Sequence, residues 1–151
     1  MNSTINIILA DDDKDDCLLF KDAVEELHLP VQLTTVHDGD ELMQHLEVIS
    51  KNLPYALFLD LNMPRKNGFE CLTEIKKNSD FNKIPVIIYS TSYDQEKANI
   101  IYNEGAHYYI CKPSDFEELK NMIHKAIMLL GKNNLQASKE NFYINKVKFV
   151  L

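Results

Sequence analysis

The chain has few of the features that mark secreted, membrane-bound or nucleic-acid-binding proteins. Its three cysteines cannot all pair, and they show neither a CxxC pair nor a His/Cys metal spacing. No apolar run approaches the roughly 20 residues that a membrane helix needs. The first apolar run, residues 5–10, is too short for a signal-peptide core and follows no basic region. We therefore expect a reduced, cytoplasmic protein with no membrane segment.

Basic residues are in the minority. Sixteen Lys and Arg stand against 23 Asp and Glu, which makes the formal net charge −7. Residues 132–151 hold four lysines and one glutamate, so the acidic excess lies in the rest of the chain. Because phosphate contacts need clustered Lys and Arg, we expect no nucleic-acid binding by the main body. The basic tail is too short to be a DNA-binding domain.

Short apolar, β-branched runs alternate with longer amphipathic stretches, which is typical of strand–helix repeats and a parallel sheet. With 151 residues the chain is long enough for about one such domain. We predict a doubly wound α/β fold of five strand–helix units in residues 1–131, with helices on both faces of the sheet. The predicted strands are residues 5–10, 31–36, 55–59, 85–89 and 108–111, of which the second is polar enough for an edge strand.

The stretches between these strands predict five helices. Asp15 or Asp16 can cap the first, and Ser114 or Asp115 the fifth, which we expect to end at Gly131. The residues expected to face inward from the first helix are Leu18, Leu19, Ala23 and Leu27.

Residues 132–151 form a C-terminal extension that follows the last predicted helix. Residues 142–151 are rich in strand-forming residues. The extension can fold back on the domain as a packing arm, or add an extra strand to the edge of its own sheet or a partner's. Disorder is the third alternative, and the large apolar residues disfavour it.

Polar side chains follow four of the five predicted strands at the point where each strand ends. The carboxyl ends of parallel strands meet at one edge of the sheet, where open α/β sheets bind their ligands. We therefore expect one shallow pocket to collect these groups. They are the acidic run Asp11, Asp12 and Asp13, the carboxylate of Asp60, the hydroxyls of Ser90, Thr91 and Ser92, and Lys112.

This set has the chemistry of a phosphoacceptor site with Asp60 as the nucleophile. Phosphoryl transfer to a carboxylate needs a divalent cation and further donors for the phosphoryl oxygens. Asp11 and Asp12 supply the oxygen ligands that Mg²⁺ prefers, Lys112 can pair with a phosphoryl oxygen, and Ser90 can donate to it. Each residue alone also fits a solvated loop, a helix entry or an ordinary surface lysine. All four signals in order, each ending its own strand, indicate a magnesium-dependent site.

On these residues the chain resembles the receiver domain of two-component response regulators, of the single-domain type typified by the bacterial chemotaxis regulator. The resemblance covers roughly residues 5–130. The motifs that carry it are residues 8–13, residues 59–64 with Gly68, residues 85–90 and residues 105–113. It implies a flavodoxin-like sheet with strand order 2-1-3-4-5.

The resemblance also implies the reaction. Asp60 would accept a phosphoryl group from the phosphohistidine of a sensor histidine kinase. Asp12, Asp60 and the backbone carbonyl of Asn62 would bind Mg²⁺ (or Mn²⁺), with Asp11 assisting through water. The expected protein is a signalling module whose phosphorylation switches a protein-interaction surface.

Three further residues match named positions of the family. Ser90 matches the hydroxyl switch residue that moves toward the phosphoryl group, and Tyr109 matches the aromatic switch residue that turns inward with it. Lys112 matches the invariant pocket lysine, and the resemblance implies a cis bond between Lys112 and Pro113, which is otherwise a minority state.

Two other functions also fit parts of this pattern. A phosphohydrolase with an aspartyl-phosphate intermediate needs a second aspartate two residues after the nucleophile, and Asn62 occupies that place. We therefore expect no enzyme beyond self-catalysed phosphorylation and dephosphorylation. A scaffold that accepts no phosphate is disfavoured by the complete acidic set and Lys112. The output is either a downstream protein target or a phosphotransfer protein, and the sequence leaves open whether the chain forms a homodimer.

Overall fold

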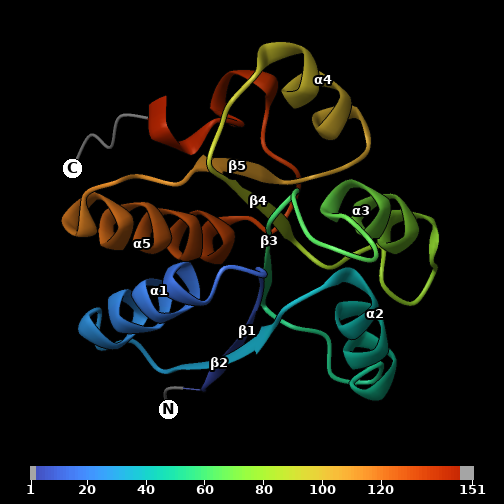
Figure 1. Ribbon diagram of the computed structural model, residues 1–151, viewed down its shortest axis with the longest axis horizontal. Coiled ribbons are helices and arrows are strands. Elements are labelled where there is room, and N and C mark those ends of the chain that lie inside the picture. Colours follow the sequence, from blue (N-terminus) through green and yellow to red (C-terminus); the bar gives the residue numbers. More distant parts are fainter. Residues whose placement is uncertain (1–2, 147–151) are drawn as a thin grey trace.

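Five short apolar strands form one parallel sheet in the order β2-β1-β3-β4-β5, as predicted. The computed structural model describes residues 3–146, and Figure 1 shows the sheet between its helices. The strands are β1 (Ile5–Ala10), β2 (Val31–Val36), β3 (Ala56–Leu59), β4 (Val86–Ser90) and β5 (Tyr108–Cys111). The helices are α1 (Lys14–Glu26), α2 (Gly39–Val48), α3 (Gly68–Lys77), α4 (Gln95–Asn103) and α5 (Phe116–Lys132).

Helices cover both faces of this sheet, as Figure 1 shows. One core cluster joins the sheet to α1 and α5, and a second joins it to α2, α3 and α4. Because β3 and β4 are covered on both sides, each of their residues is buried, and their sequences are apolar runs except for Ser90 at the end of β4. Strand β2 lies at an edge and is only partly buried, which explains its more polar sequence.

Two of the predicted helix ends are wrong. Asp13, rather than Asp15 or Asp16, caps α1, and its side chain accepts hydrogen bonds from the backbone N–H groups of both later residues. Asp115, one of the two predicted candidates, caps α5. Helix α5 continues one residue past Gly131 to Lys132. An N-cap side chain binds the N–H groups two or three residues ahead, and from Asp13 these are the N–H groups of Asp15 and Asp16, which already lie inside the helix.

The predicted inward face of α1 is also partly wrong. Leu18 and Leu19 are exposed, by 60% and 46%, whereas Cys17 and Phe20 are buried. Ala23 faces the core as predicted. Buried residues at positions 17, 20, 23 and 24 follow the period of about 3.6 residues, which leaves positions 18 and 19 on the outer side.

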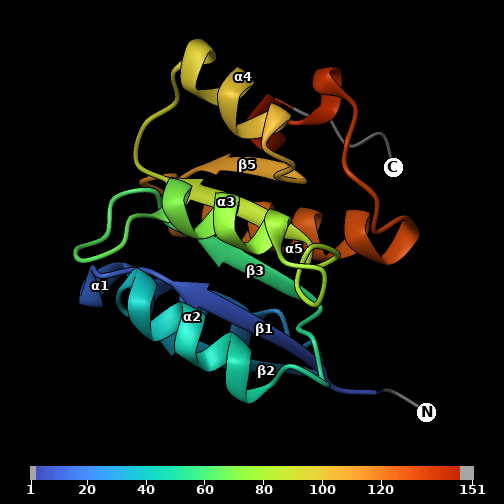
Figure 2. The same cartoon turned by 90° about the vertical axis from the view of Figure 1, so that its right-hand side faces the viewer.

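The C-terminal segment, residues 133–146, folds back across the β5 edge of the sheet (Figure 2). Phe142 joins the core cluster of α2, α3 and α4, while Ile144 joins the cluster of α1 and α5. Within residues 3–146, the only β-bridge between this segment and β5 pairs Tyr143 with Tyr109. Most of the last part of the segment is in two 3₁₀ helices, Lys139–Asn141 and Ile144–Lys146. Residues 147–151, the rest of the strand-forming stretch, lie outside the described residues.

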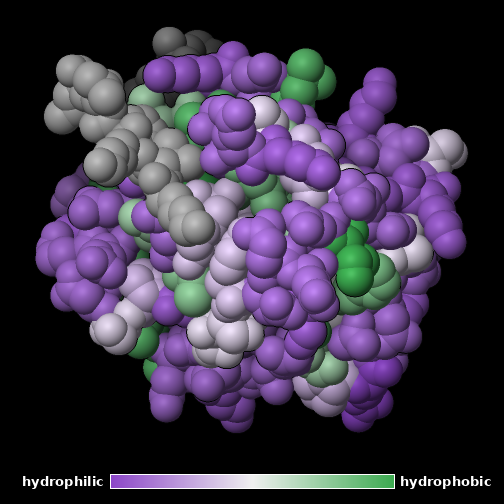
Figure 3. All heavy atoms as spheres, turned by 90° about the horizontal axis from the view of Figure 1, so that it is seen from above, coloured by the Kyte–Doolittle hydropathy of each residue, from purple (hydrophilic) through white to green (hydrophobic). Residues whose placement is uncertain are grey.

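The side chain of Asn145 completes the contact with β5. Its amide nitrogen donates to the Cys111 carbonyl and its amide oxygen accepts from the Cys111 N–H, both at 2.9 Å. Asn145 thus satisfies backbone groups that an edge strand would otherwise leave unpaired. The outer surface seen from this side is mainly hydrophilic, with scattered apolar groups (Figure 3). No helix within residues 3–146 combines the length and the apolar character needed to cross a membrane.

Candidate functional site

The parallel register of the sheet brings four strand ends to one place. Ala10 pairs with Leu59 across β1 and β3, and Ser90 pairs with Cys111 across β4 and β5. The backbone bonds continue past the strands: the Asp60 N–H donates to the Ala10 carbonyl at 2.9 Å, and the Lys112 N–H donates to the Ser90 carbonyl at 2.7 Å. Residues that follow the strands therefore lie around one point.

Three carboxylates meet at this point. Oxygen atoms of Asp11, Asp12 and Asp60 all lie within 4.8 Å of one another. Asp11 is fully buried and Asp60 is 5% exposed, whereas Asp12 is open to solvent. Carboxylates this close repel one another unless a cation offsets their charge. Two buried carboxylates and one exposed carboxylate suit a small divalent cation that keeps several of its waters.

Burial raises the pKa of Asp60 to about 7. The ammonium of Lys112 opposes this shift, and the charge of Asp11 adds to it. The Asn62 N–H donates to Asp60 Oδ1 at 3.3 Å, which stabilises the ionised form. A divalent cation at the three carboxylates would favour the ionised form far more strongly, because opposite charges at short distance lower a carboxyl pKa.

Lys112 is the buried cation of the site. Its Nζ donates to Asp11 Oδ2 at 2.7 Å and to Asp16 Oδ2 at 2.8 Å, and it lies 3.9 Å from Asp60 Oδ2. The side chain is only 9% exposed, and the ring of Tyr89 lies 5.0 Å below its Nζ. Burial alone would lower the pKa of Lys112, but its hydrogen bonds to the two carboxylates raise the pKa above the ordinary value. Lys112 is therefore held as an ammonium.

Ser90 and Tyr109 lie in the neighbouring strands β4 and β5 and line the same cavity as Asn62. Ser90 is 1% exposed, and its Oγ, which lies near the Tyr109 hydroxyl, makes no hydrogen bond of good geometry to any residue that the structure describes. An unpaired buried hydroxyl costs free energy, so a ligand that supplies an acceptor there is favoured. Tyr109 is buried, and its hydroxyl donates to the Ser92 carbonyl. Both residues line a cavity of about 330 Å³ between the β3–α3 loop and α4.

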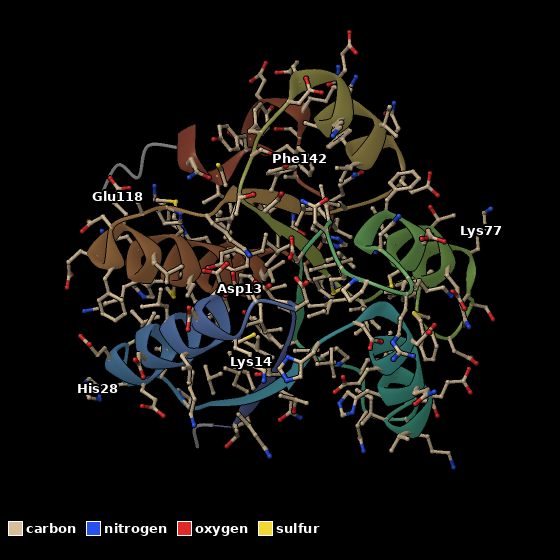
Figure 4. The ribbon with its side chains drawn as sticks, viewed as in Figure 1. Asp13, Lys14, His28, Lys77, Glu118 and Phe142 are labelled. Carbon is tan, nitrogen blue, oxygen red and sulfur yellow. The ribbon has the colours of Figure 1, made fainter. Side chains whose placement is uncertain are left out.

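The structure thus brings together the predicted residues Asp11, Asp12, Asp60, Ser90 and Lys112, with Asn62 and Tyr109 at the margin. It also adds Asp16, which sequence reasoning considered only as a helix cap. Figure 4 shows Asp13 at the start of α1, beside the strand ends, so the first turn of that helix borders the site. Helix side chains point back toward the N-terminus, and this direction, once Asp13 is known to be the cap, would have placed Asp16 near the sheet edge.

The expected cis bond before Pro113 is wrong. No peptide bond within residues 3–146 is cis, so Pro113 follows a trans bond. The trans isomer is the lower-energy state of an X–Pro bond. The turn after β5 accommodates it while Lys112 still reaches the carboxylates.

Known proteins match this chain over most of its length. A sequence model of the response regulator receiver domain matches residues 7–124. Response regulator Rcp1 of Synechocystis sp. is 31% identical over 121 residues, which covers 78% of this chain and 82% of that protein.

Solved structures of response regulators have the same fold. The phosphorylated cyanobacterial phytochrome response regulator RcpA superimposes with a TM-score of 0.78 at 29% identity, covering 90% of this chain and all of that one. The Mn²⁺-bound form of Rcp1 gives a TM-score of 0.70 at 27% identity, covering 89% and 97% of the two chains.

Proposed function

The chain belongs to the response regulator receiver domain family, and we propose that Asp60 is its phosphoacceptor. Receiver domains of response regulators interact with histidine kinases, and the proposed donor is the phosphohistidine of such a kinase. One observation carries the proposal. Asp60 lies within 4.8 Å of the carboxylate oxygens of Asp11 and Asp12, and the buried ammonium of Lys112 lies 3.9 Å from its Oδ2, so a nucleophile, candidate cation ligands and a positive charge meet at one point.

In the proposed reaction a carboxylate oxygen of Asp60 attacks the phosphorus. The P–N bond of the phosphohistidine breaks, and its electron pair stays on the imidazole nitrogen. Because the phosphohistidine ring carries a proton on its other nitrogen, it leaves as neutral histidine of the kinase. The product is an acyl phosphate on Asp60. Transfer of this kind depends on alignment and on charge stabilisation rather than on acid–base chemistry by the protein.

Asp11, Asp12, Asp60 and the backbone carbonyl of Asn62 would hold Mg²⁺ (or Mn²⁺). Two observations support these residues as metal ligands: the three carboxylates have oxygens close together, and the relative Rcp1 has been solved in an Mn²⁺-bound form. When bound, the cation offsets negative charge on the phosphoryl oxygens. Lys112 pairs with one phosphoryl oxygen, and the Ser90 hydroxyl donates to another, which satisfies the hydroxyl that is now without a partner.

We propose that phosphorylation of Asp60 changes the surface formed by β4, α4 and β5. If Ser90 moves toward the phosphoryl group, the β4–α4 loop that carries the Ser92 carbonyl moves with it, and Tyr109 loses or re-forms its bond to that carbonyl. Ser90 and Tyr109 would thereby alter the surface made by β4, α4 and β5. The reader of that surface is a downstream protein target or a phosphotransfer protein.

The test is incubation with Mg²⁺ and acetyl phosphate, followed by intact-protein mass measurement. We expect one phosphoryl adduct, absent from Asp60→Asn and absent from the native chain in EDTA. Turnover of unrelated phosphate esters would instead favour a phosphohydrolase. An intact, folded chain that takes no phosphate from either acetyl phosphate or a phosphorylated histidine kinase would contradict the proposal.

A further inference from the structure

Lys112 binds Asp16, a residue to which the resemblance to receiver domains assigns no role. Its Nζ lies 2.7 Å from Asp11 Oδ2 and 2.8 Å from Asp16 Oδ2, and both distances are those of strong, charge-assisted hydrogen bonds. The separation from Asp60 Oδ2 is 3.9 Å, too long for a hydrogen bond. The ammonium is therefore anchored beside Asp60 without being bonded to it.

Asp16 comes to Lys112 from a separate element of the fold. It lies in the first turn of α1, which Asp13 caps, and its side chain is 28% exposed against 0% for Asp11. Asp11 follows β1 and Lys112 follows β5, so the ammonium is tied to the sheet and to a helix at once. Asp15 shares the first turn and the charge of Asp16, but it is exposed and is no partner of Lys112.

From this geometry we propose that Asp16 is a positioning residue for phosphoryl transfer to Asp60. An ammonium has three N–H donors. Asp11 and Asp16 take two of them, which leaves the third for an oxygen of the incoming phosphoryl group. The inference rests on the proposed function, because it assigns Asp16 a part in the same reaction.

Loss of Asp16 would release a flexible side chain. The four-carbon stem of lysine lets its ammonium move by more than the distance in question. Without the Asp16 carboxylate, the Lys112 ammonium shifts toward Asp60 and forms a direct hydrogen bond with it. Asp60 must break this bond before it attacks the phosphorus. The phosphoryl group then meets a lysine that is no longer held in place, and misplacement of about 1 Å can cost up to 10²-fold in rate.

The experiment compares the full-length wild type with Asp16→Asn, Asp15→Asn, Asp16→Glu and Asp60→Asn. The phosphorylation rate is measured with acetyl phosphate over a range of Mg²⁺ concentrations. We expect Asp16→Asn to lower the maximal rate about tenfold or more, with the Mg²⁺ concentration for half-maximal rate within about twofold of that in Asp15→Asn. Asp16→Glu, which keeps the carboxylate, should recover part of the rate.

A second measurement follows the lysine itself. Ammonium protons held by carboxylates exchange slowly with water, so the ¹H–¹⁵N signal of the Lys112 side chain should be visible by NMR in the wild type and in Asp15→Asn. In Asp16→Asn we expect it to shift and to exchange faster. Circular dichroism shows whether each variant is folded. If Asp16→Asn does not fold, the comparison of Asp16→Glu with the wild type still tests the proposal.

The outcomes separate the two proposals. If Asp16→Asn reacts at the rate of Asp15→Asn while Asp60→Asn takes no phosphate, the positioning role is wrong and the proposed function stands. If Asp16→Asn is slow but the Lys112 signal is unchanged, Asp16 acts in another way and the positioning role is equally wrong. If the folded wild type takes no phosphate from any donor, both proposals fail together.

Discussion

Gly68 lies so close to Asp60 that a Cβ atom on residue 68 would come within 2.1 Å of the Asp60 carbonyl oxygen. The Gly68 N–H also donates to the Leu61 carbonyl at 3.0 Å, which fixes the loop between β3 and α3. The first residue of α3 and the candidate phosphoacceptor therefore share one backbone contact that only glycine permits.

We expect Gly68→Ala to lower the free energy of unfolding by about 2 kcal/mol or more, because the nearest atom is backbone and cannot turn aside. Phosphorylation should slow as well, since the shift moves the Asp60 backbone. Urea denaturation measures the first effect. Gly131→Ala is the control: among residues 3–146 its Cβ would meet only the Tyr55 hydroxyl, at 3.1 Å, and we expect a change within about 1 kcal/mol. Equal effects at both positions would show that the Asp60 contact is unimportant.

Asp12 is the exposed member of the acidic group. We expect Asp12→Asn to weaken Mg²⁺ binding about tenfold or more, since one charged oxygen ligand is lost from a site with few protein ligands. Isothermal titration calorimetry of the folded protein checks this. The control is Asp22→Asn, which removes the same charge from an exposed position of α1. Weakening of equal size in both variants would point to overall charge and not to coordination.

Substitution of Phe142 measures how much the packing of the C-terminal segment contributes to the stability of the fold. The residue is 4% exposed, its ring lies 5.1 Å from that of Tyr102, and its carbonyl accepts the Tyr109 N–H. Figure 4 shows it between α4 and the sheet. We expect Phe142→Ala to cost about 3 to 5 kcal/mol in urea unfolding. Leu135→Ala, at a site 67% exposed in the same segment, should change stability little. A small effect of Phe142→Ala would mean that the segment detaches readily.

His107 makes stability depend on pH. Its Nδ1 accepts the Val86 N–H at 3.4 Å and its Nε2 lies 3.0 Å from the Asn134 carbonyl, an arrangement that needs the neutral ring. Burial, with the nearby charge of Lys76, lowers the pKa of His107 to about 4. Because the unfolded chain has the ordinary pKa of about 6.5, it binds more protons between these values. Stability from this group is therefore full above pH 6.5 and is lost as pH falls toward 4.

The size of this pH effect is at most about 1.4 kcal/mol per pH unit. Carboxylates titrate in the same range, so the measurement is the difference between variants. We expect urea unfolding of His107→Gln to fall less steeply between pH 6.5 and 4 than that of the wild type. His124→Gln, at an exposed position of α5, is the control and should follow the wild type. Parallel curves for all three proteins would contradict the role of His107.

Much of the fold follows from local pattern. The buried strands β3 and β4 are apolar runs, except for Ser90 at the end of β4, and the helices between the strands are amphipathic, so the number and order of the units can be derived from periodicity. The inward face of α1 cannot be derived with the same certainty, because Leu18 and Phe20 are equally apolar. Only packing against the sheet distinguishes the exposed residue from the buried one.

By itself the sequence determined that Asp60, Asp11 and Lys112 follow strands, and parallel strands bring their ends together whatever else the chain does. Which carboxylates hold the lysine, by contrast, depends on how distant elements pack together. Lys112 is 101 residues from Asp11 and 96 from Asp16, and neither pair has a local spacing rule. Such bonds depend on the distance between packed elements to within a fraction of an ångström, because a hydrogen bond is lost when its atoms move beyond about 3.5 Å.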